Sequence, residues 1–301
     1  MPEMPEVETI RRGLSSRLRG QILERVEVLN AKSVQFGVGG EGATSKFPTG
    51  QKVEGLRRFG KLLAVDFESV TAVFHLKMTG QLVYRGESEF GGGHPSDSLI
   101  GALPDKSTRV ILGFADGDLY FNDQRKFGFV KFLPTNEVEN IPFVRALGPE
   151  PSSDAELDDM DFQRFLLRAR RHKKLSVKAV LLDQRVVAGI GNIYADEALW
   201  MTMLHPATPT QLVTDEQLLA LSRNAAKVMQ TSLDHGGSTA RNYVNADGQR
   251  GAYLDFANVY GRSGQPCRRC STLLEKIRVA GRGTTYCAQC QIESLPASTP
   301  P

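Results

Sequence analysis

The four cysteines of this 301-residue chain constrain its fold most strongly, because all of them lie between positions 267 and 290. They form two pairs, Cys267-x2-Cys270 and Cys287-x2-Cys290, with sixteen residues between the pairs. Each pair can make a tight knuckle, so that the four thiolates close a tetrahedron around zinc. Four protein ligands leave no open position on the metal, so we expect one structural zinc ion per chain. Four unrelated buried thiols are the alternative, which the spacing disfavours.

The chain is long enough for two domains. Hydrophobic residues make up 41% and charged residues 24%, so each half can bury a core. No run of apolar residues approaches the ~20 that a membrane-spanning helix needs. The N-terminal segment also lacks the basic start, apolar stretch and cleavage site of an export signal. We therefore expect a cytoplasmic monomer with no membrane partner.

Basic residues are concentrated in a few segments, although the net charge is only +3. The clusters fall within residues 11–19, 57–61, 168–178 and 262–282, and the densest contains Lys174 and Lys178. A protein with a basic face can bind a polyanion at modest net charge, so this distribution is compatible with nucleic acid. For any one cluster, a solvated helix face is the simpler interpretation.

Hydrophobic periodicity predicts a helix and then a series of strands in the first half of the chain. Apolar residues from Val7 to Leu18 recur at steps of three and four, which predicts an amphipathic helix over 5–19. Short apolar stretches separated by turn residues then indicate an antiparallel β-sandwich. Glycine and proline residues at 85–107 predict a long mobile loop. The expected strands are 22–29, 52–59, 62–67, 72–76, 81–84, 109–114, 119–122 and 129–132, with a hairpin turn at Asp116-Gly117.

The second half is predicted to be helical, which makes the fold class α+β. Gly189-Ile190-Gly191-Asn192 precedes one expected helix and could aim backbone N–H groups at an anion, or be an ordinary connection. The expected helices are 157–171, 177–182, 192–203 and 215–234. The expected parts are an N-terminal domain at 1–135, a linker at 136–155, a helical domain at 156–258, a zinc ribbon at 259–291 and a disordered tail at 292–301.

The chain starts with Met1-Pro2-Glu3, a string with two interpretations. Initiator methionine is normally removed before a small residue, which would leave Pro2 as the N-terminal residue. Its secondary amine would have a pKa near ~8 and be partly neutral at physiological pH. A neutral amine can attack a sugar C1′ and form an iminium, and Glu3 could supply or take a proton. Alternatively, Pro2 and Pro5 only shape the entrance of the helix, and the local string favours neither interpretation.

Several strings occur in a fixed order over almost the whole chain. They are Pro2 to Thr9, Gly60-Lys61, His75-Leu76-Lys77-Met78-Thr79-Gly80, Asp123-Gln124-Arg125-Lys126-Phe127-Gly128, Leu181-Leu182-Asp183-Gln184, Gly189 to Tyr194, Val259-Tyr260-Gly261-Arg262 and the cysteine module. Together they resemble the bacterial formamidopyrimidine-DNA glycosylases, a family that removes 8-oxoguanine and ring-opened purines from DNA. The resemblance implies a β-sandwich joined to a helix–two-turns–helix domain with a zinc finger, in a bacterial enzyme active at the nucleoid.

The resemblance implies a role for each matching residue. Pro2 would be the Schiff-base nucleophile and Glu3 the proton donor. Lys61 would serve β-elimination, while Arg282, between two glycines, would serve δ-elimination and backbone binding. The partner would be double-stranded DNA that contains oxidised purines or abasic sites. Met78, Arg125 and Phe127 would fill the gap left by the flipped base, and His75, Lys174 and Asn192 would contact the DNA.

Other interpretations remain open at this point. Without the resemblance, Met78 and Phe127 would be assigned to the core. A related glycosylase for oxidised pyrimidines would share Pro2, Glu3, Lys61 and the ribbon, whereas the strings around Met78 and Phe127 favour the purine enzyme. A zinc-ribbon DNA-binding protein without catalytic activity is disfavoured by the intact Pro2-Glu3 pair.

The sequence departs from the family pattern at Thr79, which replaces a common serine, in the length of the loop before Ser107, at residues 236–243, and at the two positions that follow. Lys77 stands where the family often has glycine before the methionine. Ser107 occupies the position where many members have a histidine that contacts DNA, so that contact is not expected here.

Overall fold

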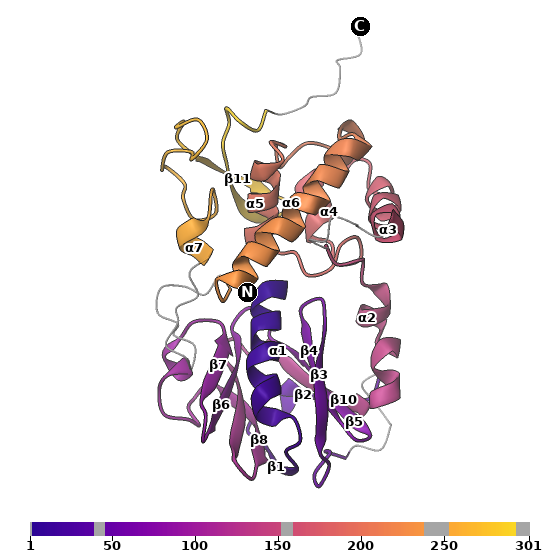
Figure 1. The fold of residues 1–301 in the computed structure, drawn as a ribbon, viewed down its shortest axis with the longest axis vertical. Helices are drawn as coiled ribbons and strands as arrows, with labels where there is room; N and C mark the ends of the chain where they lie inside the picture. Colours follow the sequence, from indigo (N-terminus) through magenta and orange to yellow (C-terminus); the bar gives the residue numbers. More distant parts are fainter. Residues whose placement is uncertain (1, 39–45, 152–158, 238–252, 293–301) are drawn as a thin grey trace, which may run out of the picture. The chain divides into compact units, whose positions relative to one another are not determined.

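The computed structural model describes residues 2–38, 46–151, 159–237 and 253–292, without the side chains of residues 159 and 160. The chain divides into two compact units (Figure 1). Apart from Ile292, the predicted disordered tail lies outside the described residues. Unit 1 comprises residues 1–146 and 235–252, and unit 2 comprises residues 147–234 and 253–301.

Unit 1 begins with helix α1 (Met4–Leu18), which confirms the helix expected over 5–19. Glu3 is its N-cap residue and forms a capping box with Glu6, whose carboxylate accepts the Glu3 N–H at 2.8 Å. Such a box provides partners for polar groups that a helix start leaves unpaired. The predicted apolar stripe is buried. The helix ends before Gly20, whose φ of +87° favours glycine.

Within the described residues, unit 1 contains two five-stranded sheets, with strand orders β1-β8-β9-β6-β7 and β2-β10-β5-β4-β3. All eight expected strands are confirmed, with small shifts at their ends. The expected hairpin is also confirmed, but its turn residues are Ala115 and Asp116. The strands are β1 (Leu23–Val28), β2 (Val34–Phe36), β3 (Val53–Phe59), β4 (Leu62–Phe67), β5 (Val70–His75), β6 (Gly80–Gly86), β7 (Phe90–Gly93), β8 (Thr108–Phe114), β9 (Gly117–Asp123) and β10 (Phe129–Pro134).

The sandwich departs from a purely antiparallel one at one pair of these described strands. β2 runs parallel to β10, with Val34 opposite Val130. β2 has three residues and follows the 3-10 turn η1 (Ala31–Ser33). A strand this short shows no clear alternation of apolar and polar residues, so the sequence does not predict it.

Helix α1 packs against β7 and β3, the edge strand of each sheet (Figure 1). Its buried residues join those of both sheets in one hydrophobic core. Because an open sheet edge invites pairing with another chain, this position also protects two edges. Members of the core from α1 and from both sheets include Ile10, Leu14, Leu63, Phe74, Phe121 and Phe132.

The glycine-rich segment 85–107 is not one continuous loop, so that part of its prediction is wrong. It contains β7, which pairs with β6, and the 3-10 turn η2 (Asp97–Leu99). A Cβ on Gly92 would lie 2.4 Å from Ile10 Cγ1. Gly92 therefore permits the close approach of α1 to β7.

The segment expected as a linker begins with folded structure that belongs to unit 1. It forms the 3-10 helix η3 (Thr135–Asn140) and helix α2 (Pro142–Ala146). Val138 and Ile141 are buried in a second hydrophobic cluster against the sandwich. These apolar side chains anchor the stretch to the sandwich, although its prolines and acidic residues are typical of a linker.

Unit 2 contains the four expected helices and the hairpin between the cysteine pairs. Helix α5 ends two residues earlier than expected, near Met203, which has a φ of +59° that is not helical. α5 packs against α4, α6 and β12. The chain therefore has the expected α+β fold, with a β-sandwich, a helical region and a zinc-finger hairpin. The elements are α3 (Asp159–Arg170), α4 (Val177–Leu182), α5 (Asn192–Met201), α6 (Asp215–Asp234), α7 (Tyr253–Phe256), β11 (Glu275–Val279) and β12 (Arg282–Tyr286).

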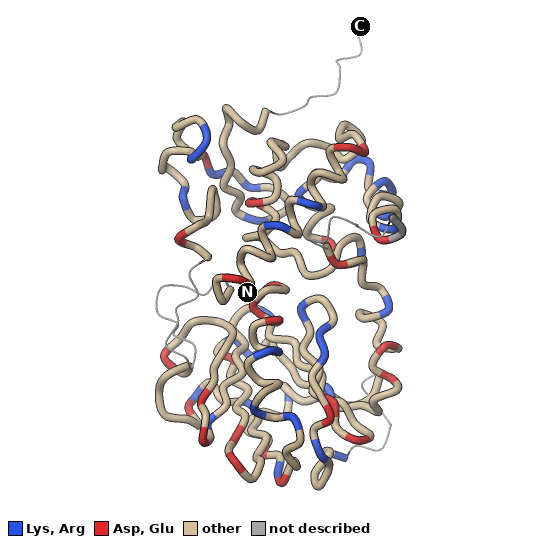
Figure 2. Tube along the Cα trace, in the orientation of Figure 1, with Lys and Arg blue, Asp and Glu red and all other residues tan. Residues whose placement is uncertain are grey.

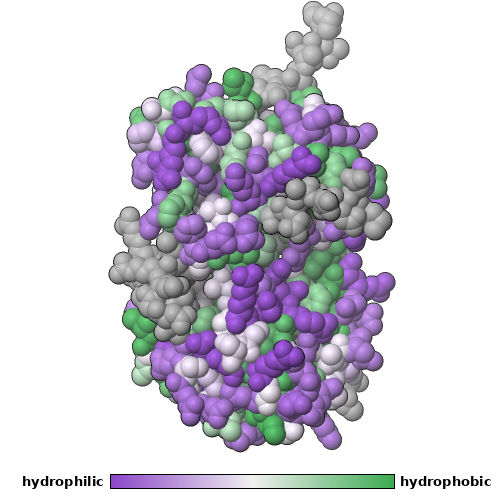
Figure 3. Space-filling model, viewed as in Figure 1, coloured by the Kyte–Doolittle hydropathy of each residue, from purple (hydrophilic) through white to green (hydrophobic). Residues whose placement is uncertain are grey.

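Apolar side chains are mainly internal in both units. On the face drawn in Figure 3, hydrophilic residues predominate and hydrophobic residues form separate patches. No described helix has both the length and the apolar composition to cross a membrane.

We predict that Gly13→Ala lowers the free energy of unfolding by about 1–3 kcal/mol, although alanine is the better helix former by about 1 kcal/mol. The reason is that a Cβ on Gly13 would lie 2.1 Å from Phe90 Cε2 of β7. Gly55→Ala is the control, because nothing lies within 4 Å of the Cβ position there. Chemical denaturation measures both variants. An unchanged midpoint for Gly13→Ala would contradict the packing of α1 on β7.

Candidate active site

Pro2 and Glu3 are buried at the N-terminal end of α1, Glu3 with 2% of its surface exposed. The capping box fixes the backbone here, because Glu6 holds the Glu3 N–H. The N-terminal end of a helix carries partial positive charge, which disfavours a second positive charge nearby.

Lys61 lies in the two-residue turn between β3 and β4, where Phe59 pairs with Leu62. Gly60 is the first residue of this turn and has a φ of +57°, as the first position of a type II′ turn requires. Lys61 is 5% exposed, so its side chain lies within the protein. Its charge contributes to the lowered pKa of His75, which indicates that the ammonium group lies near that ring.

His75, at the end of β5, is held as a neutral ring. Burial, together with the charges of Lys77 and Lys61, lowers the pKa of His75 to about 3. Its Nδ1 accepts the Lys77 N–H at 3.1 Å, so the proton of the neutral ring is on Nε2. The ring therefore offers one N–H donor near neutral pH, which suits a phosphate oxygen. Lys77 adopts a φ of +50°, a conformation that explains why glycine suits this position.

Asp123 joins the segment after β5 to the segment after β9. Its buried carboxylate accepts the Thr79 hydroxyl and the N–H groups of Arg125 at 3.2 Å and Gly128 at 2.6 Å. Thr79 Oγ1 also accepts the Arg125 N–H at 3.1 Å. Because Thr79 directly follows Met78, these bonds fix the segments of Met78 and Arg125 to one another.

Phe127 and Arg125 project from this framework. Phe127 is 56% exposed, so assigning it to the core is wrong. The Arg125 guanidinium lies over its ring, 4.9 Å from the centroid. Met78 is half-buried. An exposed aromatic ring stacked with a cation is typical of a surface that contacts a ligand.

Ser107 belongs to an internal network. It is 3% exposed, and its Oγ donates to Asp105 Oδ1 at 2.7 Å and lies 3.1 Å from Ser98 Oγ. The hydroxyl therefore stabilises this turn from within, which agrees with the expectation that Ser107 does not replace the DNA-contacting histidine.

In unit 2 the four cysteines come together as expected. Their sulfur atoms all lie within 4.8 Å of one another. Cys270 Sγ is 3.4 Å from Cys290 Sγ and 3.5 Å from Cys287 Sγ. A tetrahedral site with Zn–S bonds of about 2.3 Å separates its sulfurs by about 3.8 Å, so the cluster, completed by Cys267, fits zinc.

Trp200, the single tryptophan of the chain, lies against this cysteine cluster. Its indole N–H and the Arg269 backbone N–H both donate to Cys267 Sγ at 3.4 Å. Burial would raise the pKa of Cys267, but the N–H donors outweigh it and hold that pKa below its usual value. The Arg269 guanidinium also stacks on the indole, 4.1 Å from the centroid. These contacts favour the thiolate, the form that binds a metal.

Arg282 is exposed at the start of β12, directly after the turn formed by Ala280 and Gly281. Both turn residues have a positive φ, of 50° and 72°, as a type I′ turn requires. Asn192, the first residue of α5, donates from Nδ2 to the Gly283 carbonyl at 3.0 Å. The structure therefore brings Asn192 next to the hairpin strand that carries Arg282.

The assignment of Lys178 to a basic surface cluster is wrong. Its side chain is fully buried and donates to Asp196 Oδ1 at 2.5 Å and to Thr284 Oγ1 at 2.6 Å. Asp196 Oδ2 accepts the Thr285 N–H at 3.1 Å. Burial raises the pKa of Asp196 to about 6, although the charge and hydrogen bond of Lys178 act to lower it. Helices α4 and α5 and strand β12 therefore meet at a buried ion pair.

The remaining basic residues between α3 and α4 are accessible. Lys174 is exposed in this turn, as are Arg171 and Lys173. Figure 2 shows Lys and Arg residues along α3 and the turn that follows it. This surface could attract a polyanion.

Glu197, next to Asp196, is a residue that the sequence analysis missed. Its Oε1 accepts the N–H groups of Val259 at 2.8 Å and Tyr260 at 2.9 Å. Its Oε2 accepts the N–H of Asn258 at 2.8 Å and Asn258 Nδ2 at 3.0 Å. One buried carboxylate thus fixes the chain that enters the cysteine module. Two adjacent acidic residues in an otherwise apolar helix are the signal that could have identified it.

The fold and these sites define a protein with an N-terminal β-sandwich, a helical domain and a four-cysteine zinc finger. Family models match each part in turn. They are the formamidopyrimidine-DNA glycosylase N-terminal domain over residues 1–130, the formamidopyrimidine-DNA glycosylase H2TH domain over 147–244, and a zinc finger found in FPG and IleRS over 264–292. The chain belongs to the formamidopyrimidine-DNA glycosylase family.

Relatives match over nearly their full length. The formamidopyrimidine-DNA glycosylase of Pediococcus pentosaceus is 37% identical over 294 residues, which cover 97% of this chain and 99% of its own. That of Streptococcus pneumoniae is 37% identical over 293 residues, with the same shares. A Lactococcus lactis FPG variant in complex with a Fapy-dG containing DNA is similar in structure, with a TM-score of 0.83 and 32% identity over 97% of this chain and 100% of that chain. The Lactococcus lactis Fpg with an abasic site containing DNA has a TM-score of 0.82, with the same identity and shares.

We predict that Lys178→Met destabilises the protein by about 3–5 kcal/mol, because it leaves the Asp196 carboxyl buried without its counter-charge. The double variant Lys178→Met/Asp196→Leu should recover most of this loss. Arg164→Met, which breaks an exposed ion pair with Asp161, should cost less than about 1 kcal/mol. Urea denaturation compares the free energies of unfolding of the three variants with that of the wild type. A single Lys178 variant as stable as the wild type would mean that the pair does not hold α4 to α5.

Proposed function

We propose that this protein is a bifunctional DNA glycosylase that excises oxidised purines, such as 8-oxoguanine and formamidopyrimidines, and then cleaves the strand. The observation that carries the proposal is the position of Pro2 and Glu3 at the buried, capped start of α1, in a chain of this family. The Lactococcus lactis complexes with Fapy-dG and abasic-site DNA support the same partner here, double-stranded DNA with oxidised purines or abasic sites.

The chemistry would begin once removal of Met1 makes Pro2 the N-terminal residue. The proline nitrogen attacks C1′ of the damaged nucleotide, the glycosidic bond breaks, and Glu3 acts as the proton donor. Opening of the sugar ring leaves an iminium between the proline nitrogen and C1′. The iminium acidifies the C2′ protons, so loss of one of them expels the 3′ phosphate by β-elimination, a step served by Lys61. Further δ-elimination expels the 5′ phosphate with the help of Arg282.

Three residues would fill the space that the extruded base leaves in the stack, namely Met78, Arg125 and Phe127. Extrusion costs a few kcal/mol of unstacking, and a wedge offsets part of this cost. The exposure of Phe127 and its stacking with Arg125 support this role, because an aromatic ring can enter the stack while the guanidinium bonds the orphaned cytosine.

The DNA backbone would be held by residues of both units. The neutral His75 ring offers an Nε2–H donor, and Lys174 and Arg282 offer exposed cations. Asn192 would add an amide beside the Arg282 hairpin. We assign base excision and β-elimination to residues 1–135 and backbone binding chiefly to residues 156–258 and 259–291, the last of which also carries Arg282 for δ-elimination.

We further propose that each chain binds one zinc ion through Cys267, Cys270, Cys287 and Cys290. Four thiolate ligands leave no site for substrate, so the metal would stabilise the hairpin that carries Arg282 and take no part in bond breaking. The enzyme would act as a monomer in the bacterial cytoplasm, at the nucleoid.

An N-terminal extension that converts the proline nitrogen to an amide should reduce covalent trapping to background, because an amide nitrogen is not a nucleophile. Pro2→Gly, which replaces the secondary amine with a primary one, should lower trapping less. The measurement is borohydride trapping of the protein on duplex DNA with one abasic site, resolved on a gel. Pro5→Ala is the control, since it alters a nearby proline of α1 and keeps the amine. Trapping by a protein with a blocked N-terminus would refute the assignment of the nucleophile.

Phe127→Ala should slow excision of a paired 8-oxoguanine by about one to two orders of magnitude, because ~1–3 kcal/mol of stabilisation of the extruded state is lost. Met78→Ala and Arg125→Ala should act in the same direction. Cleavage at a preformed abasic site should be largely spared, since no base must be extruded. Single-turnover rates on both substrates measure the difference.

The core variant Phe74→Ala is the control for this comparison. Phe74 is fully buried, so its truncation should lower the melting temperature and depress both activities alike. Equal losses of activity on both substrates for Phe127→Ala, with a lowered melting temperature, would refute the assignment of Phe127 as a residue that fills the space left by the extruded base.

A further inference from the structure

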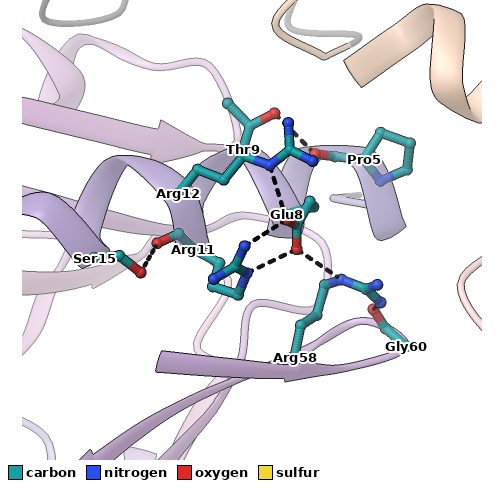
Figure 4. Close-up of polar contacts among 8 residues, drawn as sticks. All are labelled: Pro5, Glu8, Thr9, Arg11, Arg12, Ser15, Arg58 and Gly60. Atoms are coloured by element: carbon teal, nitrogen blue, oxygen red, sulfur yellow. Dashed lines mark hydrogen bonds and ion pairs between the residues drawn. The ribbon is translucent and has the colours of Figure 1, made fainter. Parts of the chain in front are cut away.

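The carboxylate of Glu8 in α1 receives hydrogen bonds from three arginines (Figure 4). Arg11 donates to Oε2 at 2.9 Å and to Oε1 at 2.8 Å, and Arg12 Nε donates to Oε1 at 2.9 Å. Arg58, which lies on β3, donates from Nε to Oε2 at 3.2 Å. Two of these arginines belong to the helix itself, so the contact with Arg58 is the one that ties Glu8 to the sheet.

Arg58 extends this contact to the turn that carries Lys61. Its Nη1 donates to the Gly60 carbonyl at 2.9 Å, while its Nε remains bonded to Glu8 (Figure 4). A planar guanidinium can hold two such bonds in fixed directions, which the point charge of a lysine cannot do. The Gly60 carbonyl belongs to the peptide bond between Gly60 and Lys61. The orientation of this peptide therefore sets the direction in which Lys61 leaves the turn.

The link is both charged and shielded from water. The side chains of Glu8 and Arg58 are only 11% and 14% exposed. Burial acts to raise the pKa of Glu8, but the hydrogen bonds of Arg11 and Arg12 and the charges of Arg11 and Arg58 outweigh it and hold that pKa at about 2. The carboxylate therefore stays ionised near neutral pH. A buried ion pair is a weak source of net stability compared with apolar packing of the same volume, which argues that geometry is what this one supplies.

We infer that Glu8 and Arg58 are positioning residues for Lys61. They bond α1, the helix that directly follows Pro2 and Glu3, to the peptide that directs Lys61, so that the nucleophile and the lysine keep a fixed relative position through two successive steps. The inference rests on the proposed function, because it assumes that Lys61 takes part in β-elimination. Glu8 and Arg58 themselves affect the reaction only through the position of the turn that carries Lys61.

Arg57 provides a matched control on the same strand. Successive residues of a strand point to opposite faces, and Arg57 pairs with Asp66 of β4 at 2.6 and 2.9 Å. Arg57→Gln and Arg58→Gln each remove one positive charge and one ion pair from β3. A general effect on stability or on attraction to DNA would therefore be similar in the two variants.

The test uses the zinc-loaded full-length protein and duplex DNA with one abasic site. We expect Arg58→Gln and Glu8→Gln to slow strand cleavage about tenfold, while the initial rate of borohydride trapping stays within about twofold of the wild type. Arg57→Gln should leave both rates near those of the wild type. Arg58→Lys should not restore cleavage, because it lacks the fixed pair of donors. Amide hydrogen exchange in residues 59–62 should be faster in Arg58→Gln than in Arg57→Gln.

Equal cleavage rates for Arg57→Gln and Arg58→Gln, or full activity of Arg58→Lys, would overturn the inference. So would a parallel loss of trapping and cleavage with a lowered melting temperature and no change of exchange at the turn, since this would show that Glu8 and Arg58 only stabilise the fold. If the wild-type protein does not trap on abasic DNA, the proposed function fails instead. The exchange comparison then still decides whether Arg58 holds the turn.

Discussion

Two adjacent buried carboxylates on α5 hold the helices of unit 2 to its cysteine module. Glu197 accepts the N–H groups of the chain that enters the module, and Asp196, paired with Lys178, accepts one from β12. In the protein interior, a backbone N–H group that loses its acceptor costs more free energy of folding than a typical hydrogen bond contributes. A bound metal can join the two cysteine pairs, but the hydrogen bonds of Asp196 and Glu197 fix the position of the hairpin relative to α5. Asn192, at the start of the same helix, is therefore held beside Gly283.

Buried carboxylates organise the loops of unit 1 in the same manner. Asp123 accepts hydrogen bonds from two loops, and Glu6 and Glu8 accept hydrogen bonds around the first turns of α1. Asp123 and Glu6 accept backbone N–H groups that the regular hydrogen bonding of helix and sheet leaves unpaired, whereas Glu8 accepts from arginine side chains. Hydrogen bonds have a preferred direction, whereas the hydrophobic effect has none. The apolar core therefore favours burial in general, and the carboxylates set the geometry of the candidate site residues.

The regular elements and the cysteine module could be predicted because their signals are local, in periodicity, turn residues and spacing. β7 could not, because its glycines make room for groups on other elements, such as the side chain of Ile10 beside Gly92. The charge of Lys178 favours a position on the surface. Its burial could not be predicted, because its partner Asp196 comes close to it only in the folded chain. Apart from the cysteines, and from Pro2 and Glu3, whose chemistry the sequence also suggested, the candidate site residues came from a family resemblance rather than from a physical pattern. Glu8 and Glu197, which hold neighbouring segments in place, escaped because the role of a carboxylate depends on which donors surround it in space.

Trp200 lies where α5 meets the cysteine cluster, with its indole N–H on Cys267 and the Arg269 guanidinium on its ring. Since the chain has no other tryptophan, its indole emission comes from this place alone. Emission from an indole depends on the groups that touch the ring, and oxidation of the thiolates or exchange of their metal changes those groups. The protein therefore contains its own fluorescent reporter of the cysteine cluster, and the state of that cluster can be followed without a label.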